Sequence, residues 1–254
     1  METSPRPTPS TNAIYLQNGS YVFAILAQIA GLVVGFIAIA HDDTPSDLHT
    51  LLVLDVVVQI VEGTWYISVG VLYLLTSLEL KVSYRYSDWA VTTPIQLVCL
   101  YYFALFELDH CKPIEFGASE NVLAVCVIVI MDWLMLLVGF VYEIEWTYVT
   151  KILDIGAADG FGLTWGFFAL FAAVTPVGIA TVDASDPEAT SLFLITFLLW
   201  MIYGLVALAF PGTKNAMIRS TAYSLLDLVS KNGVGIAYAL WAIYWEEDTC
   251  AASA

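Results

Sequence analysis

The run Asp227-Leu228-Val229-Ser230-Lys231-Asn232 lies within the last long apolar segment of the chain, residues 217–245. Lys231 is the only lysine of that segment, and its central position argues against a side chain that merely snorkels to a membrane surface. A charged residue in such a segment is costly, needs a partner and indicates a functional site. Asp227 precedes Lys231 by four residues, which places a counter-charge on the same helix face. An amine among apolar groups is also suited to forming a Schiff base with an aldehyde.

Similar apolar segments recur along the whole chain. Of its 254 residues, 59% are hydrophobic and 13% are charged, whereas soluble domains carry about 25% charged residues. A helix needs about 20 apolar residues to span a bilayer, and seven segments reach that length. They are residues 20–40, 50–75, 84–106, 120–142, 161–182, 190–210 and 217–245. We therefore expect an all-α, multi-pass integral membrane protein built as a bundle of seven transmembrane helices.

The rest of the sequence narrows the classes of function. The bundle, residues 20–245, is flanked by a polar segment at 1–19, without signal-peptide features, and by a short acidic tail at 246–254. The net charge of −16 argues against nucleic acid as a partner. The cysteines show no CxxC or His-paired spacing, so we expect neither a disulfide framework nor a metal site, and no motif predicts an enzyme. These cysteines are Cys99, Cys111, Cys126 and Cys250.

Polar residues form single-faced rows in two of the expected helices. In segment 84–106 the row occupies offsets 0, 3, 7, 11 and 14: Arg85, Asp88, Thr92, Gln96 and Cys99. In segment 50–75 the row occupies offsets 0, 4, 7 and 11: Asp55, Gln59, Glu62 and Tyr66. Asp132 adds an acid to segment 120–142. One buried acid is readily explained as a hydrogen-bonded staple between helices, whereas five acids with one arginine and one lysine indicate a proton or ion path.

The motif Arg85-Tyr86-x-Asp88-Trp89-x-x-Thr92-Thr93-Pro94, combined with Asp227-x-x-x-Lys231, closely resembles the microbial (type 1) rhodopsins, and the resemblance covers all seven segments. It implies that Lys231 carries all-trans retinal as a protonated Schiff base, with Asp88 and Asp227 as the counterion pair. Arg85 would keep both acids ionised. The chemistry fits, because a protonated imine in a medium of low dielectric constant needs a nearby anion.

Aromatic residues are expected to line the retinal, because a long conjugated chain needs flat walls. By the same resemblance, the wall residues are Trp89, Thr93, Trp200 and Tyr203. Trp165 is a further candidate, and Gly204 stands where many family members have proline. Gln96 matches a colour-tuning position of the proteobacterial pumps, where glutamine implies absorption of blue light.

The residues differ in what they indicate about the use of light. Outward proton pumps of the family usually carry a carboxylic donor eleven residues after Asp88. This chain has Cys99 there, and a thiol is too weak an acid for fast reprotonation near neutral pH. Asp88 together with Thr92 argues against a chloride pump. The run Asp227-x-x-Ser230-Lys231-Asn232 instead resembles the seventh helix of channelrhodopsins and viral-type rhodopsin channels. Ser230 of this run and Thr92 of the polar row in segment 84–106 are therefore expected along an ion path.

The resemblance to channels also assigns gate residues. In those proteins the asparagine beside the lysine forms a central gate with an acid of the second helix, here Asn232 and Glu62. Asp55 falls at the next acid of the path, and Thr93 with Asp132 resembles the pair that couples retinal isomerisation to gating. Neither Glu62 nor Asn232 is expected to touch the Schiff base, so changing them should leave the colour nearly unchanged. A light-gated cation channel is the first expectation; a proton pump of non-classical donor or direction and a sensory rhodopsin are the alternatives.

Two signals disagree about how the protein faces the membrane. The family places its N-terminus outside, whereas Lys and Arg in the short loops number five against one and favour a cytoplasmic N-terminus. The five are Arg6, Lys81, Lys151, Lys214 and Arg219, and the one is Lys112. The family often forms trimers or pentamers, so analogy also predicts a homo-oligomer in the lipid bilayer, with cations or protons as the transported species.

Overall fold

The structure is a computed structural model that describes residues 11–41, 44–76, 84–108, 114–143, 158–210 and 216–244. Six long helices come first: α1 (Thr11–Ile39), α2 (Ser46–Thr76), α3 (Arg85–Leu108), α4 (Ser119–Glu143), α6 (Ala158–Ala184) and α7 (Pro187–Ala209). The seventh has three consecutive parts, which are α8 (Ala216–Asp227), the π-helical turn η3 (Leu228–Asn232) and α9 (Gly233–Ile243). The predicted all-α bundle of seven helices is confirmed.

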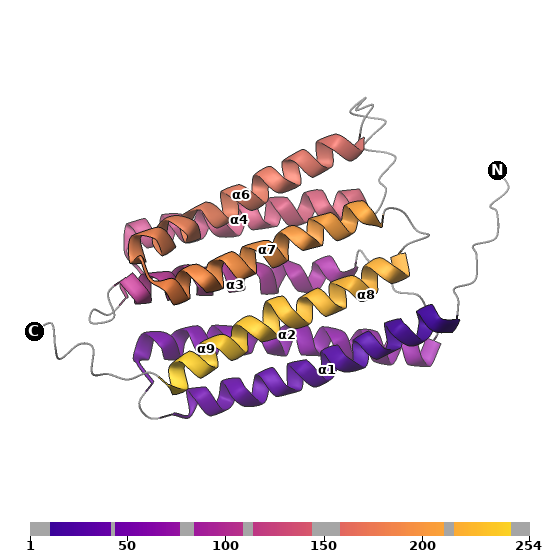
Figure 1. Cartoon of the computed structure of the whole chain (residues 1–254), viewed down its shortest axis with the longest axis horizontal. Coiled ribbons are helices and arrows are strands. Elements are labelled where there is room, and N and C mark those ends of the chain that lie inside the picture. The colour runs from indigo at the N-terminus through magenta and orange to yellow at the C-terminus, as the bar shows by residue number, and fades with distance from the viewer. Residues whose placement is uncertain are drawn as a thin grey trace, which may run out of the picture.

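The helices lie side by side along one long axis (Figure 1). α3 is central in the bundle, where it contacts α2 on one side and α4, α6 and α7 on the other. α1 packs against α2, α8 and α9, so helices from opposite ends of the chain are neighbours. Because α2 and α7 both contact η3, their inward side chains meet around Lys231.

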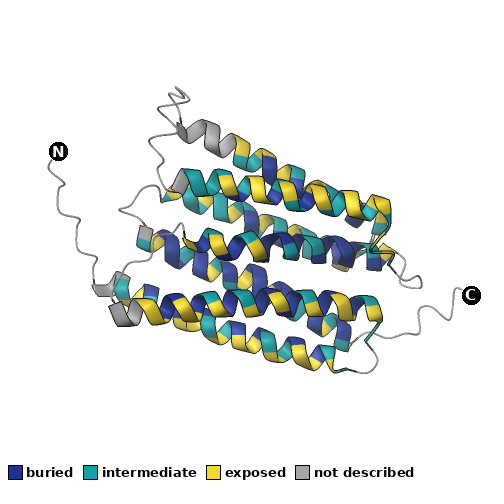
Figure 2. Cartoon of the chain, turned by 180° about the vertical axis from the view of Figure 1, so that it is seen from behind, coloured by how far each residue is buried: buried dark blue, intermediate teal, exposed yellow. Residues whose placement is uncertain are grey.

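The polarity of the bundle is the reverse of that of a soluble protein. Exposed residues lie on the outer faces of the helices (Figure 2), and they include Leu123 and Val182, which are 67% and 75% exposed. Arg85 and Lys231 are only 2% and 1% exposed. Within the described part of the chain, six helices are long and apolar enough to cross a membrane, and the three-part seventh runs beside them over residues 216–243. The chain is therefore an integral multi-pass membrane protein, as predicted.

Prolines and a capping aspartate show how the sequence shapes these helices. Asp186 accepts the N–H of Ala189 at 2.9 Å and so caps α7, while Pro187 occupies the first position, where its missing N–H costs nothing. Pro94 lies inside α3 and leaves the carbonyl of Ala90, four residues earlier, without its helical donor. The indole of Trp133 on α4 donates to that carbonyl at 2.8 Å, which ties α4 to α3.

The first helix begins earlier than the sequence predicted. α1 starts at Thr11, so residues 11–19 of the expected polar segment are helical. Gln17 and Ser20 are buried there and find partners, since Gln17 donates to the Tyr21 hydroxyl at 3.1 Å and Ser20 donates to the Gln17 carbonyl. The acidic tail at 246–254 lies outside the described residues, as do Cys111 and Cys250, while Cys99 and Cys126 are free thiols.

Most of the Lys and Arg residues that predict the orientation in the membrane also fall outside the described ranges. They are Arg6, Lys81, Lys112, Lys151 and Lys214. Arg219 lies in α8, where it is buried and donates to the carbonyl of Phe210. Its charge is therefore engaged within the protein. The orientation in the membrane stays a prediction.

Candidate functional site

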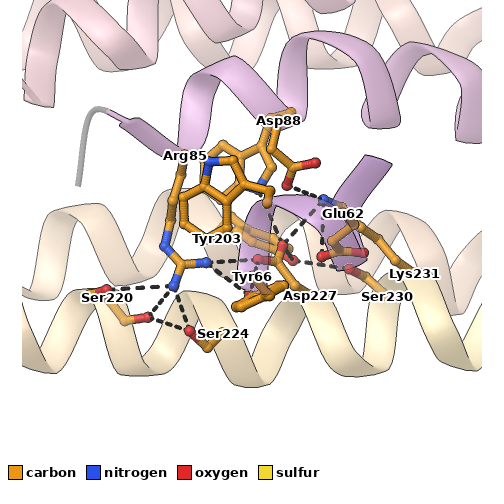
Figure 3. Close-up of polar contacts among 12 residues, drawn as sticks. Glu62, Tyr66, Arg85, Asp88, Tyr203, Ser220, Ser224, Asp227, Ser230 and Lys231 are labelled. Atoms are coloured by element: carbon orange, nitrogen blue, oxygen red, sulfur yellow. Dashed lines mark hydrogen bonds and ion pairs between the residues drawn. The ribbon is translucent and has the colours of Figure 1, made fainter. Parts of the chain in front are cut away.

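Lys231 lies in the middle of the bundle and faces three carboxylates. Its Nζ lies 3.2 Å from Oδ2 of Asp88 on α3 and 3.3 Å from Oε1 of Glu62 on α2. Oδ1 of Asp227, where α8 ends, is 3.6 Å away. All four side chains are at most 2% exposed, and Figure 3 shows them converging from different helices. The structure thus places the two expected counterions at the lysine and adds a third acid.

The third acid corrects one expectation. The sequence placed Glu62 in a gate that does not touch the lysine nitrogen, whereas the structure puts its carboxylate as close to Nζ as that of Asp88. The helix periodicity gave the correct inward face of α2. It gave no information on how closely α2 approaches the seventh helix. Because Glu62 contacts the lysine nitrogen, its substitution is no longer expected to leave the colour unchanged.

A π-helical turn presents the lysine. The N–H of Gly233 bonds to the carbonyl of Leu228, five residues earlier instead of the usual four. This wider turn follows Asp227 directly and contains Lys231, so it sets how the two charged side chains face each other. Turns of this kind are frequent at functional sites.

Asp227 is held by a dense set of donors. Its Oδ2 accepts from Arg85 at 2.8 Å and from the Tyr66 hydroxyl at 2.7 Å. Its Oδ1 accepts from the Tyr203 hydroxyl at 2.7 Å and from the Trp89 indole at 3.2 Å. One guanidinium and three neutral donors therefore stabilise the charged carboxylate and fix its position.

Arg85 is itself anchored to α8. Its second terminal nitrogen donates to the Ser220 carbonyl at 3.0 Å and to the Ser224 hydroxyl, and these contacts are visible in Figure 3. The sequence assigned Arg85 to both counterions, but the guanidinium pairs with Asp227, while Asp88 faces Lys231.

Asp88 and Glu62 are bound much less completely than Asp227. Oδ1 of Asp88 and both oxygens of Glu62 receive no hydrogen bond from the part of the chain that the structure describes. Among the described residues, the Lys231 nitrogen lies 3.2 Å from Asp88 and 3.3 Å from Glu62 and forms an ion pair with each. The site therefore has one fixed carboxylate and two whose surroundings leave proton-accepting oxygens available.

An apolar pocket opens beside Lys231, between α3, α4, α6, α7 and the seventh helix. The predicted residues Trp89, Thr93, Gln96, Trp200 and Tyr203 all line it. Its remaining aromatic lining, which the sequence reading did not identify, is Tyr86, Phe167 and Tyr223. The charged residues of its lining, Asp227 and Lys231, both come from the seventh helix, and the rest of the lining is uncharged and mostly apolar.

Trp165 is not part of this lining, which corrects the sequence prediction. Its ring is 44% exposed and packs edge-to-face against Phe168. The neighbouring residues of α6, Gly166 and Phe167, face the pocket instead. The prediction was wrong because the glycine-rich start of α6 gives no firm helical register. Gly204 also lines the pocket, and a Cβ there would lie 3.0 Å from the Phe167 ring, so a larger residue would narrow the pocket.

Two hydrogen bonds join α3 to its neighbours around the pocket, and two more lie within α3 itself. The Thr93 hydroxyl lies 2.7 Å from Oδ2 of Asp132 on α4 and 2.8 Å from the Trp89 carbonyl. Gln96 donates to the Ser230 carbonyl at 3.0 Å, and Thr92 donates to the Asp88 carbonyl at 3.1 Å. The predicted Thr93 and Asp132 pair is therefore in direct contact, and Gln96 reaches the turn that holds Lys231.

A polar cluster adjoins Lys231 on the side of α1 and α2, and we call it the gate cluster after the role that the sequence predicts for Glu62 and Asn232. Its members are Gln28, Gln59, Glu62 and Asn232. All four are at most 2% exposed, and both amide atoms of Gln28 and of Asn232 lack a hydrogen-bond partner among the described residues. Gly31 of α1 leaves room for them, because a Cβ there would lie 2.9 Å from Oδ1 of Asn232 and 3.0 Å from Oε1 of Gln59.

Asp55 lies two helical turns before Glu62 on α2 and is also buried. Its carboxylate rests against Gly235, one turn after Lys231, so closely that a Cβ on the glycine would overlap it at 2.2 Å. Cys99 of α3 is buried nearby, with its sulfur 4.0 Å from the carbonyl of Leu51, one turn before Asp55. Buried polar groups thus continue along α2 beyond the lysine.

A buried lysine on the seventh helix, paired with carboxylates and opening into an aromatic pocket, defines a retinal-binding membrane protein of the microbial rhodopsin class. The family comparison agrees with the geometry. Residues 16–244 match the family described as "Bacteriorhodopsin-like protein", and the chain belongs to this family. The predicted resemblance to type 1 rhodopsins is confirmed.

Solved structures show the same fold. The viral rhodopsin OLPVRII superposes with a TM-score of 0.72 at 21% identity, covering 91% of this chain and 100% of its own. A thermophilic rhodopsin gives 0.70 at 21% identity, with 93% and 96% covered. Xanthorhodopsin, described as a light-driven ion pump with dual chromophore, gives 0.69 at 17% identity, with 93% and 96% covered. No curated protein matches the chain.

Membership of this family implies a retinal chromophore, and the residues fit one. Lys231 supplies an amine at the polar end of the pocket, the carboxylates supply negative charge for its protonated linkage, and the aromatic rings supply flat apolar walls. The protein therefore belongs among the light-driven ion transporters and photoreceptors.

Proposed function

We propose that this protein is a light-gated cation channel that binds all-trans retinal at Lys231 and absorbs blue light. The observation that carries the proposal is the gate cluster, in which an acid of α2 and the asparagine beside the lysine adjoin the retinal attachment point. Light would then act on a nitrogen that directly contacts a residue of the ion path.

The unpaired polar atoms of the gate cluster support a hydrated path. Buried polar groups are nearly always hydrogen-bonded, to protein or to ordered water. Gln28 and Asn232 have no partner for either amide atom among the described residues, and Gln59 has none for Oε1. Water can enter where such groups gather, and the carboxylate of Glu62 favours cations over anions at that point.

Asp55 supports a continuation of the path along α2. It lies seven residues before Glu62, about 10 Å along the helix axis, and on the same inward face. Between these two acids lies Gln59, whose amide is 3.4 Å from the Lys231 carbonyl. Acidic side chains along a constriction favour cations by their charge, so a row of two acids and an amide facing the seventh helix supports a cation path.

The chain's own residues explain how the site would respond. Bound retinal supplies light-driven isomerisation. Lys231 exchanges its contacts with Asp88 and Glu62 when its nitrogen moves, and Asp227 stays fixed by Arg85. Thr93 links the pocket wall to Asp132 on α4, so a change in pocket shape also reaches a second helix pair.

A proton pump of unusual donor is the second candidate, and Asp55 favours it. The position expected for a carboxylic donor holds Cys99, but Asp55 supplies a buried carboxyl from α2 near that thiol. Along α2, Asp55 is followed by Glu62, which contacts Lys231, and then by Tyr66, which contacts Arg85. Asp55 and Arg85 therefore lie on opposite sides of Lys231. Such an acid is placed to return a proton to the lysine nitrogen.

Electrical recording separates these functions. Under blue light, cells expressing the protein should give a current that reverses where the cation gradient predicts. A current of one fixed sign at every voltage would instead establish pumping, and no current would favour a sensory role.

Glu62→Gln and Asn232→Ala should change selectivity or closing kinetics. Cys126→Ala, which changes an exposed thiol on α4, serves as the matched control. A current indifferent to both gate changes would mean that the ions pass elsewhere. The transported species are proposed to be cations, and the assembly a homo-oligomer in the bilayer.

A further inference from the structure

We propose that Asp88 and Glu62 share a single proton opposite Lys231, so that the counter-charge of the lysine nitrogen is divided between α3 and α2. This inference rests on the proposed attachment of retinal to Lys231 and does not depend on whether the protein conducts or pumps. It assigns Glu62 a second role beyond the gate cluster, as a counterion in direct contact with the lysine.

The charge balance of the site leads to the shared proton. Two cations, Arg85 and Lys231, face three acids, and all five side chains are at most 3% exposed. Arg85 pairs with Asp227 at 2.8 Å, and three neutral donors complete the shell of that acid. One cation, Lys231, then remains for two carboxyl groups. A buried charge without compensation is costly, so one of the two carboxyls keeps a proton.

The two carboxyls are placed almost equally around the lysine nitrogen, so the geometry does not assign the proton to one of them. Their oxygens lie 3.2 Å and 3.3 Å from the same Nζ, one from α3 and one from α2. Oδ1 of Asp88 and both oxygens of Glu62 are otherwise without a hydrogen bond among the described residues. The charged or titratable groups around this pair are Lys231, Asp227, Arg85, Tyr66 and Tyr203, and the uncharged amide of Gln28 adjoins Glu62 from α1. Two acids this close to one cation titrate as a unit.

The shared proton gives the gate cluster a direct signal. When the lysine nitrogen moves away from one of the two carboxyls, that group loses its counter-charge and takes the proton from the other. The transfer is balanced within the pair, because one O–H bond breaks as the other forms and no net proton is gained or lost. The charge of Glu62 thereby changes within the cluster that contains Asn232 and Gln59.

A pH titration of the visible spectrum tests the shared proton on the full chain loaded with retinal. Less negative charge beside the nitrogen favours the delocalised excited state and moves absorption to longer wavelength. The unmodified protein should shift to longer wavelength in acid, as the pair takes a second proton, and to shorter wavelength in base, as it loses the first. Glu62→Gln and Asp88→Asn should each abolish the alkaline shift within the visible band. Glu107→Gln, a buried acid near the end of α3, should keep both shifts.

Infrared spectra recorded in the dark give an independent measure. The unmodified protein should show the C=O band of a protonated carboxyl that disappears in Glu62→Gln, and Asp88→Asn provides the same test if the first variant does not fold. An alkaline shift and a carboxyl band that both persist in the two variants would overturn the shared proton. Failure of the unmodified protein to become coloured with retinal would overturn it together with the retinal assignment. A coloured protein that shows the expected shifts but carries no current would overturn the channel function alone.

Discussion

Replacing Gly235 by alanine tests whether Asp55 lies against the seventh helix. The added Cβ would lie 2.2 Å from Oδ2 of Asp55 and 2.8 Å from its Cγ. Ordinary contacts begin near 3.4 Å, so the carboxylate or the helix must move by about 1 Å. Overfilling a packed interior typically costs about 1–3 kcal/mol. We therefore expect Gly235→Ala to be less stable than Gly233→Ala, an alanine variant without this overlap, by an amount in that range.

Gly233→Ala is the matched control. It makes the same chemical change two residues earlier in α9, where the glycine is exposed and no atom lies within 4 Å of an added Cβ. Both variants share the gain in helix propensity, about 1 kcal/mol, so their difference isolates the contact with Asp55. Asp55→Ser combined with Gly235→Ala should recover the lost stability, because the shorter side chain gives the methyl group room.

The measurement is the temperature at which the retinal-loaded protein loses its visible absorption in detergent. For a chain of this size, each kcal/mol should lower that temperature by about 2–4 °C. The absorption maximum should not move, because Gly235 does not line the retinal pocket. Photocurrents should fall or slow in Gly235→Ala if Asp55 is part of the path. Equal stability and equal currents in the two alanine variants would refute the placement of Asp55.

Lys231→Ala should abolish the visible absorption, because Lys231 supplies the amine that adjoins the pocket, and a coloured variant would contradict the attachment site. Gln96→Leu should move the absorption maximum to longer wavelength, and an unmoved spectrum would contradict its tuning role. Gly31→Ala should reduce the photocurrent, because its Cβ would lie 2.9 Å from Oδ1 of Asn232; a normal current would place the path away from α1. The Lys and Arg count predicts that an N-terminal epitope tag stays unlabelled on intact cells, and strong surface labelling would exclude that orientation.

Residues whose positions depend on helix periodicity were the most predictable part of this protein. The offsets within segment 84–106 placed Arg85, Asp88 and Gln96 on one face, and all three are buried toward the site. The four-residue spacing of Asp227 and Lys231 likewise put two charges together. Such spacings are set within one helix, so they need no knowledge of how the helices pack.

Features that depend on packing between helices were not predictable in the same way. The approach of Glu62 to Lys231 depends on the distance between α2 and the seventh helix, which no spacing within one helix encodes. The residues Leu228–Asn232 do not by themselves distinguish a π-helical turn from an ordinary α-helical one, although this turn holds the lysine. The prediction that Trp165 lines the pocket was wrong because neighbouring positions on a helix point about 100° apart. The pocket is lined by the next residues, Gly166 and Phe167.

The unequal bonding of the three acids explains how one site can be both rigid and responsive. Asp227 accepts from Arg85, two hydroxyls and an indole, so moving it would break four bonds at once. Asp88 and Glu62 have oxygens without such bonds, so their contacts with Lys231 change at much lower cost. A displacement of the lysine nitrogen is therefore transmitted through these two acids, one on α3 and one on α2. Of the two, only Glu62 belongs to the gate cluster, so under the proposed channel function α2 is the helix through which the retinal site would control the ion path.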